Sequence, residues 1–148
     1  MTWRPVPKPK KREPKHKWQA AYWEACKATS STNKYGAKKT THAGLSFASQ
    51  LEADVYDLLV WFVSKKKLRA LRCQPHVFLT DARIEMIPDF SAFDLSLGEL
   101  VYYEAKGFET ATWRLKKKLW RVYGPGRLRI YMTDRGELKM VEEIIPKR

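Results

Sequence analysis

Residues 88–106 read PDFSAFDLSLGELVYYEAK, and this stretch decides how the centre of the protein folds. Two largely apolar segments, 90–95 and 99–106, have the length and the aromatic content of core strands. Residues 96–98 separate them, and the serine and glycine at this point favour a turn. The stretch therefore predicts a short hairpin of two core strands directly after Asp89.

The segments on either side of this hairpin change between helical and strand patterns. Apolar residues recur at helical spacing in two segments, whereas shorter apolar runs bounded by turn residues are typical of strands. Together they predict an α/β domain, in which a small mixed β-sheet is flanked by helices. The helices are expected at residues 50–63 and 110–123, strands at 74–79, 82–87 and 127–132, and a closing helix or strand at 137–145.

The net charge of +13 on this chain of 148 residues is concentrated near the N-terminus. Residues 1–39 hold 11 basic and 2 acidic side chains, and residues 1–17 contain four prolines. Because proline blocks regular hydrogen bonding and like charges repel each other, we expect an extended arm. The chain is accordingly divided into a basic arm with a short aromatic helix, residues 1–33, and a folded domain, residues 34–148. The charge indicates a polyanionic partner, nucleic acid before an acidic membrane surface.

Several classes of protein are excluded. No apolar run approaches the roughly 18 residues of a membrane span, and the N-terminus lacks a secretory signal, so we expect no membrane partner and a cytoplasmic location. Cys26 and Cys73 lie outside any CxxC motif, which excludes a cysteine-rich zinc site and indicates a reducing compartment. No glycine-rich phosphate loop occurs, so no nucleotide cofactor is expected.

Three charged residues around the central hairpin could carry chemistry. Glu104 and Lys106 are two residues apart on one strand, so their side chains point to the same face, and Asp89 joins them if its strand is adjacent. Two carboxylates suit Mg²⁺, for which Mn²⁺ can substitute, and such a metal polarises a phosphodiester and acidifies a water molecule. The lysine can orient or deprotonate that water. The alternative is an ordinary salt bridge between Glu104 and Lys106.

Pro88-Asp89 followed by Glu104-Ala105-Lys106 resembles the motif of the PD-(D/E)XK nuclease superfamily. The segment KYGAKKTTHAGLSFASQLEADVY, residues 34–56, is similar to the start of a phage-borne family within that superfamily. It also resembles the opening of the phage endonuclease I type of Holliday-junction-resolving enzyme, which acts as a homodimer. The resemblance covers residues 34–132 and implies a restriction-endonuclease-like core with metal-dependent nuclease activity.

This resemblance implies a role for each residue of the motif. Asp89 and Glu104 would hold Mg²⁺, and the Ala105 carbonyl is a candidate third ligand. Lys106 would position or activate the attacking water.

Glu52 matches the acidic residue on the first helix of the superfamily. The resemblance implies that it holds a second metal or the water bound to it. The alternative is a structural role at the start of the helix, because Glu52 follows Ser49 at the spacing of a capping box.

The second helix is expected to bury an apolar face and to expose a basic one. The two tryptophans on it are expected in the core rather than stacked on bases. The predicted buried stripe is Ala111, Leu115, Leu119 and Val122, and the tryptophans are Trp113 and Trp120.

Basic and aromatic residues outside the motif are candidates for contacts with the DNA backbone. The alternatives are a solubilising tail, a glycine-bearing turn with solvated lysines, and a solvated helix face. The candidates are Lys8, Lys10, Lys11 and Arg12 in the arm, Tyr35, Lys38 and Lys39 after it, and Arg114, Lys116, Lys117, Lys118 and Arg121 on the second helix.

The leading prediction is a Mg²⁺-dependent DNA endonuclease that recognises branched or flapped DNA, such as a Holliday junction. Shape recognition is favoured because nothing in the chain resembles a base-reading module. A homodimer is expected, since resolving a junction requires two cuts, and a phage-encoded enzyme would act in the cytoplasm of its bacterial host. The alternatives are the end-cutting nuclease subunit of a transposition system and a non-catalytic, basic architectural DNA-binding protein.

Overall fold

The computed structural model describes residues 40–42 and 44–147 of the chain. The predictions for the arm, for its short aromatic helix and for the segment that follows lie outside these residues. The candidates for DNA contacts that lie outside them are Lys8, Lys10, Lys11, Arg12, Tyr35, Lys38 and Lys39.

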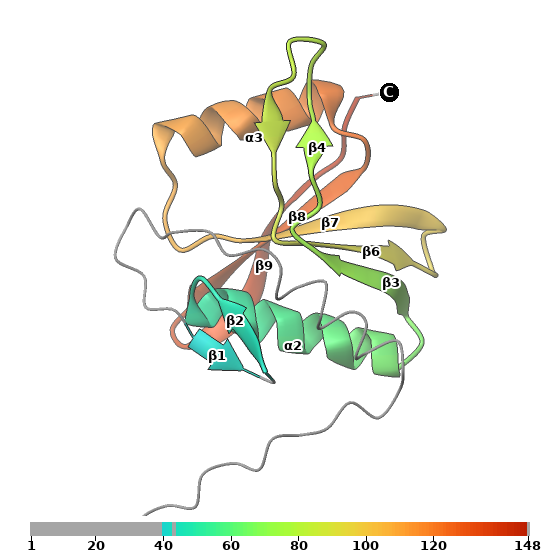
Figure 1. Ribbon diagram of the computed structural model, residues 1–148, viewed down its shortest axis with the longest axis vertical. Helices are drawn as coiled ribbons and strands as arrows, with labels where there is room; N and C mark the ends of the chain where they lie inside the picture. Colours follow the sequence, from blue (N-terminus) through green and yellow to red (C-terminus); the bar gives the residue numbers. More distant parts are fainter. Residues whose placement is uncertain (1–39, 43, 148) are drawn as a thin grey trace, which may run out of the picture.

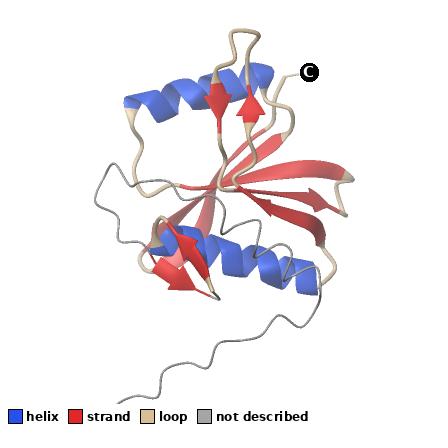
Figure 2. Cartoon of the chain, viewed as in Figure 1, coloured by secondary structure: helices blue, strands red, loops and turns tan. Residues whose placement is uncertain are grey.

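Within the described residues, the chain forms two helices and nine strands (Figures 1 and 2). Five strands make one mixed sheet in the order β3-β6-β7-β8-β9, and the others form the hairpins β1–β2 and β4–β5. Strands β7 and β8 are parallel, whereas the other neighbours in the sheet are antiparallel. The predicted mixed α/β fold is therefore confirmed. In chain order the elements are β1 (Thr40–His42), β2 (Leu45–Phe47), α2 (Gln50–Ser64), β3 (Leu68–Cys73), β4 (Val77–Phe78), β5 (Glu85–Met86), β6 (Phe90–Asp94), β7 (Glu99–Ala105), α3 (Ala111–Tyr123), β8 (Arg127–Asp134) and β9 (Glu137–Ile144).

The sheet lies between two helices, with α2 on one face and α3 on the other (Figure 1). The neighbouring residues Tyr102 and Tyr103 on β7 point to opposite faces, and both are buried. Tyr103 packs in a core with Val55 of α2, and Tyr102 packs in a second core with Trp120 of α3. Because both faces of β7 are covered, this strand and the residues at its end are held firmly in the centre of the fold.

Helix α2 begins and ends where the sequence predicts. The Ser49 hydroxyl accepts a hydrogen bond of 3.2 Å from the Glu52 N–H, which satisfies one of the free donors at the start of the helix. At the other end, Lys65 is the C-cap and donates its N–H to the Trp61 carbonyl. Glu52 thus lies in the first turn of the helix, three residues after the cap.

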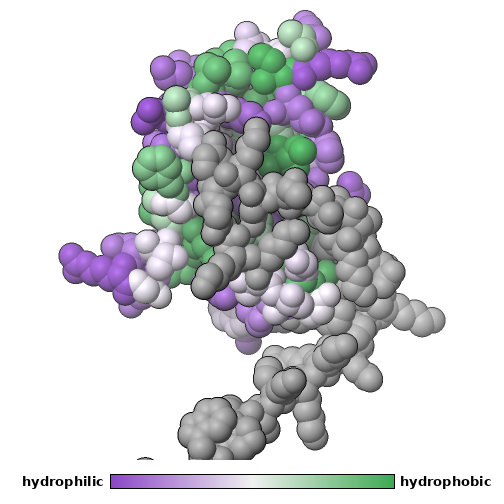
Figure 3. Space-filling model, turned by 60° about the vertical axis from the view of Figure 1, so that its left-hand side comes forward, coloured by the Kyte–Doolittle hydropathy of each residue, from purple (hydrophilic) through white to green (hydrophobic). Residues whose placement is uncertain are grey.

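Helix α3 packs on the sheet through its tryptophans, as predicted. The Trp120 side chain is completely buried, and its Nε1–H donates a hydrogen bond of 2.8 Å to the Gly126 carbonyl. The predicted stripe of smaller apolar residues is wrong, because Leu115 and Val122 are 57% and 54% exposed. The large indole rings fill the space above the sheet and turn that stripe outward. Apolar side chains accordingly gather at the upper end of the molecule in Figure 3, the end that α3 and the β4–β5 hairpin occupy in Figure 1.

Two strands of the sheet differ from the sequence prediction. Strand β3 was not predicted, because its basic residues hide the apolar pattern and a bulge between Arg69 and Arg72 interrupts its register with β6. The closing segment, for which the sequence left a helix or a strand open, is the edge strand β9, and it pairs with β8 over its length.

No helix within residues 40–42 and 44–147 is both long and apolar enough to span a membrane. Cys73, at the end of β3, is disulfide-bonded. Such bonds are uncommon in the reducing compartment that the sequence predicts. Cys26 lies outside the described residues.

Candidate active site

The β6–β7 hairpin brings Asp89 next to the end of β7. Phe90 pairs with Tyr103 in an antiparallel register, so Asp89 and Glu104, one residue further out, lie beside each other. The Asp89 Oδ2 atom accepts a hydrogen bond of 2.7 Å from the Ala105 N–H. The strand that follows Asp89 is therefore adjacent to the strand that carries Glu104, so Asp89 joins Glu104 and Lys106.

Lys106 lies on the same face of the chain as Glu104. The distance between Lys106 Nζ and Glu104 Oε1 is 3.5 Å, a loose contact for an ion pair, and the ammonium group lies 4.9 Å from the centre of the Trp113 ring. The second oxygen of the Glu104 carboxylate, Oε2, is buried and has no hydrogen-bond partner among the described residues. The salt bridge that the sequence left open as an alternative is thus present, but it satisfies only one of the two oxygens.

Glu52 combines a position at the start of α2 with closeness to the other acidic residues. Its Oε2 atom accepts a hydrogen bond of 2.7 Å from the Ala48 N–H, so the carboxylate helps to cap the helix. The residue is only 6% exposed, and its negative charge raises the pKa of both Asp89 and Glu104. Glu52 therefore contributes to the electrostatics of the site as well as to the helix end.

Burial and repulsion raise the pKa of all three carboxyl groups. The pKa of Asp89 lies well above its usual value, because of burial first and then the charges of Glu104 and Glu52. Burial raises the pKa of Glu104 to about 7, although the nearby Lys106 lowers it. Burial also raises the pKa of Glu52, and this effect outweighs hydrogen bonds from the helix start. A cation bound among these three carboxyl groups would reduce the repulsion between their negative charges and favour their ionised forms.

The donor set at Asp89 and Glu104 is compatible with Mg²⁺. This ion keeps several waters and is usually held through one or two carboxylates, so Asp89 and Glu104 suffice as protein ligands, and the Ala105 carbonyl stays a candidate third ligand by resemblance alone. The unpartnered Oε2 of Glu104 is an acceptor that a cation would satisfy. No group of three or more His, Cys, Asp or Glu side chains in the described part of the chain is placed to hold a metal ion. Glu52 thus does not complete a cage of three carboxylates in this structure.

The protein family described as Protein of unknown function (DUF1064) matches residues 32–136. The chain belongs to the DUF1064 family. The matched region contains the four side chains of the candidate site and ends directly before β9. Among curated proteins, none is significantly similar in sequence to the chain.

The three consecutive lysines of α3 have different surroundings in this DUF1064 protein. The side chain of Lys117 is 11% exposed and forms ion pairs with Glu109 and, at 2.8 Å, with Glu142 of β9. Lys118 is exposed, whereas Lys116 is half-buried and lines a pocket. Of the other basic candidates on this helix, Arg114 is exposed and Arg121 is 2.7 Å from Glu142. The face predicted to follow phosphates is therefore divided, and Lys117 and Arg121 are already paired with acids.

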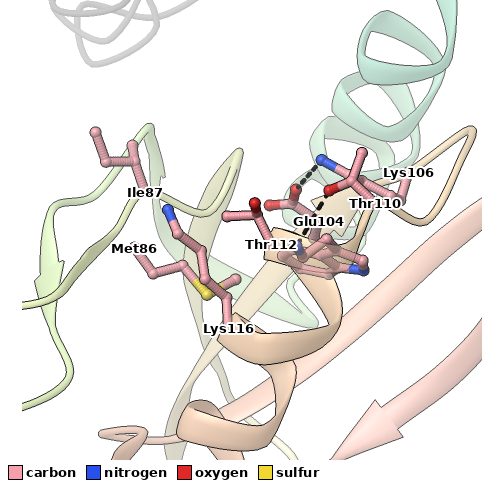
Figure 4. Close-up of a pocket in the computed structure, with 8 residues that line it drawn as sticks. Met86, Ile87, Glu104, Lys106, Thr110, Thr112 and Lys116 are labelled. Carbon is pink, nitrogen blue, oxygen red and sulfur yellow. Dashed lines mark hydrogen bonds and ion pairs between the residues drawn. The ribbon is translucent and has the colours of Figure 1, made fainter.

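A pocket of about 190 Å³ opens beside Glu104 and Lys106 (Figure 4). Most of the residues that line this pocket are not among the candidates predicted from the sequence. The N-cap preference of threonine was a signal for Thr110, whereas no local pattern marks the residues of the β4–β5 hairpin, which only the tertiary fold brings here. The remaining lining residues are Met86, Ile87, Thr110, Thr112, Trp113 and Lys116.

Proposed function

We propose that the protein is a Mg²⁺-dependent DNA endonuclease that hydrolyses phosphodiester bonds. One observation carries the proposal: Asp89, directly before β6, lies beside Glu104 of β7, Lys106 is on the same face, and one buried oxygen of Glu104 has no partner among the described residues. A metal-dependent hydrolase that cuts a phosphodiester needs acidic ligands for the metal and a positive charge near the phosphate, and these residues could supply both.

Each residue of the site has a distinct task in this proposal. Asp89 and Glu104, with the Ala105 carbonyl, would hold Mg²⁺, which when bound polarises the phosphodiester and lowers the pKa of a water molecule. Lys106 donates a hydrogen bond to the attacking water and offsets the negative charge that develops on the phosphate. The water oxygen forms the new bond to phosphorus and releases its proton to the solvent, while the bond from phosphorus to the leaving oxygen breaks and that oxygen takes up a proton from the solvent. The Trp113 ring beside the ammonium restricts where Lys106 can point.

Glu52 acts at longer range in the same proposal. Its carboxylate is anchored to the start of α2, so it adds negative charge at a fixed position near Asp89 and Glu104. Such a charge strengthens cation binding and can hold a water molecule of the metal.

The proposed substrate is branched or flapped DNA, cut by a homodimer in the cytoplasm. The motif resemblance supports this choice, and the net charge of +13 supports binding through phosphates rather than through bases.

An architectural DNA-binding protein is the second candidate. It is favoured by the ion pair between Glu104 and Lys106 and by the fact that, within residues 40–42 and 44–147, no set of three metal-ligating side chains is preformed. In that case the acidic residues would be structural, and DNA would be bound but not cut.

A cleavage assay separates the two candidates. The full chain is incubated with labelled four-way junction, flap, nicked and linear duplex DNA, in Mg²⁺ and in EDTA. Cleavage that requires Mg²⁺ and is lost in Asp89→Asn supports the nuclease. Cleavage that survives EDTA, or that persists in Asp89→Asn, would refute the metal mechanism, and binding without cleavage would favour the architectural protein.

A further inference from the structure

The pocket beside Glu104 and Lys106 has the positively charged side chain of Lys116 on the opposite wall. In Figure 4, the Lys116 side chain extends from α3 toward the space between Ile87 and Thr112, while Glu104 and Lys106 lie at the other end. We propose that this pocket binds the DNA phosphate next to the one that is cut, and that Lys116 holds it. This inference rests on the proposed nuclease function, and it names the residue that places the strand on the site.

The surroundings of the three α3 lysines single out Lys116. Lys117 is committed to Glu109 and Glu142, and Lys118 is on the exposed side of the helix. Lys116 is half-buried and has no ion-pair partner among the described residues. An unpaired ammonium group that faces a pocket is a suitable point charge for a phosphate.

The start of α3 supplies further donors to the same space. Thr110 and Thr112 line the pocket, and they lie at the first turn of a 13-residue helix, whose free N–H groups and dipole favour an anion. The Thr110 hydroxyl is already used as the N-cap, where it accepts from the Trp113 N–H, so the Thr112 hydroxyl is the one available to a ligand. The buried, unpartnered Oε2 of Glu104 lies at the other end of the pocket, where the Mg²⁺ of the proposed function would satisfy it.

The remaining walls of the pocket are apolar. Met86 and Trp113 are 2% and 4% exposed, and Ile87 covers the side formed by the β4–β5 hairpin. Because Ile87 is 42% exposed, this side of the pocket is open to water and gives a deoxyribose an apolar surface to pack against.

Neutral phosphate analogues provide the test. After the cut position has been mapped, substrates are made with one uncharged methylphosphonate at either phosphate that neighbours the cut. For the unmodified protein, the analogue on one side should lower kcat/KM by about 10- to 100-fold, the value of a hydrogen bond to a charged group. In Lys116→Gln the same analogue should cause no further loss. If Lys116→Gln is as sensitive to both analogues as the unmodified protein, the inference is overturned.

Lys139→Gln is the matched comparison, because it removes the same charge from an exposed lysine of β9 that does not line the pocket. It should keep the full sensitivity to the analogue and lose less than about threefold in kcat/KM. Lys116→Arg, which retains the charge, should regain part of the activity that Lys116→Gln loses, and equal melting temperatures of these variants exclude a folding defect.

DNA binding in EDTA gives a second reading that does not depend on cleavage. Lys116→Gln should bind more weakly, and the slope of log K against log salt should fall by about one relative to Lys139→Gln. Equal binding by the two variants overturns the pocket as a phosphate site. If binding shows the Lys116 effect but no DNA is ever cut, the nuclease proposal fails while the phosphate site stands, so the two failures are distinguishable.

Discussion

Glu104 is expected to make the protein less stable as the pH rises. Its side chain is 8% exposed, and burial raises its pKa from the usual 4.5 to about 7 in spite of Lys106. Between these two values the folded protein keeps a proton that the unfolded chain has released, so the free energy of unfolding falls with rising pH. The complete loss is about 3 kcal/mol above pH 7, of which about 2 kcal/mol falls between pH 5.5 and pH 8.

Urea denaturation in EDTA at these two pH values measures the effect. Glu104→Gln cannot ionise at this position, so its free energy of unfolding should drop by about 2 kcal/mol less than that of the unmodified protein. Glu137→Gln changes an exposed glutamate of β9 and should behave like the unmodified protein. An identical pH dependence in Glu104→Gln and the unmodified protein would refute the reasoning, because the buried carboxyl would then carry no pH-dependent cost.

Magnesium extends the same experiment. A cation at Asp89 and Glu104 would compensate the ionised carboxylates, so Mg²⁺ at pH 8 should raise the free energy of unfolding of the unmodified protein. The gain should be absent in Glu104→Gln. Equal stabilisation of both proteins by Mg²⁺ would place the ion elsewhere.

Three further predictions concern the helices. Lys117→Gln should lower the free energy of unfolding in urea by about 1–2 kcal/mol, because it removes two ion pairs of a nearly buried ammonium group. Lys118→Gln, the control, should change it by less than about 0.5 kcal/mol. Equal effects of the two substitutions would show that the ion pairs add nothing to stability. Ser49→Ala should cost about 1 kcal/mol of stability and retain DNA cleavage. Glu52→Gln should reduce cleavage at a nearly unchanged melting temperature. If Glu52→Gln lost stability but kept cleavage, Glu52 would act only in the helix cap. Trp120→Ala should lower the free energy of unfolding by about 3–5 kcal/mol in thermal or urea denaturation, because it leaves a cavity and removes the hydrogen-bond donor of the Gly126 carbonyl. A decrease below about 1 kcal/mol would contradict the packing of α3 on the sheet.

Local patterns predicted the elements that bury a clear face. Helix α2 carries a periodic apolar stripe and a serine cap, and β6 and β7 are continuous apolar runs around a turn, so each could be placed from the sequence. Strand β3 escaped because it lies at an edge of the sheet, where half of its residues contact water and basic side chains are tolerated. In α3 two apolar stripes compete, and only packing against the sheet decides that the tryptophan stripe is buried.

The candidate site shows the same division. The spacing in Glu104-Ala105-Lys106 placed the two charged side chains on one face, and the distance of 3.5 Å between Lys106 Nζ and Glu104 Oε1 agrees. Residue spacing could not predict which basic residues of α3 are free and which are paired with acidic residues. The partners of Lys117 are 8 and 25 residues away along the chain, so the sequence could not reveal that this lysine is already paired.

By itself, the sequence determined the alternation that sets which side chains share a face, the capped start of α2, and the choice of Asp89, Glu104 and Lys106 as the candidate catalytic residues. The tertiary structure decided what those residues encounter. It placed Asp89 beside Glu104 through the register of β6 and β7, left one buried oxygen of Glu104 without a partner among the described residues, and brought Lys116 to the same pocket. The reason is that periodicity acts over a few residues, whereas burial, pKa shifts and ion pairing depend on atoms that are distant along the chain and close in space.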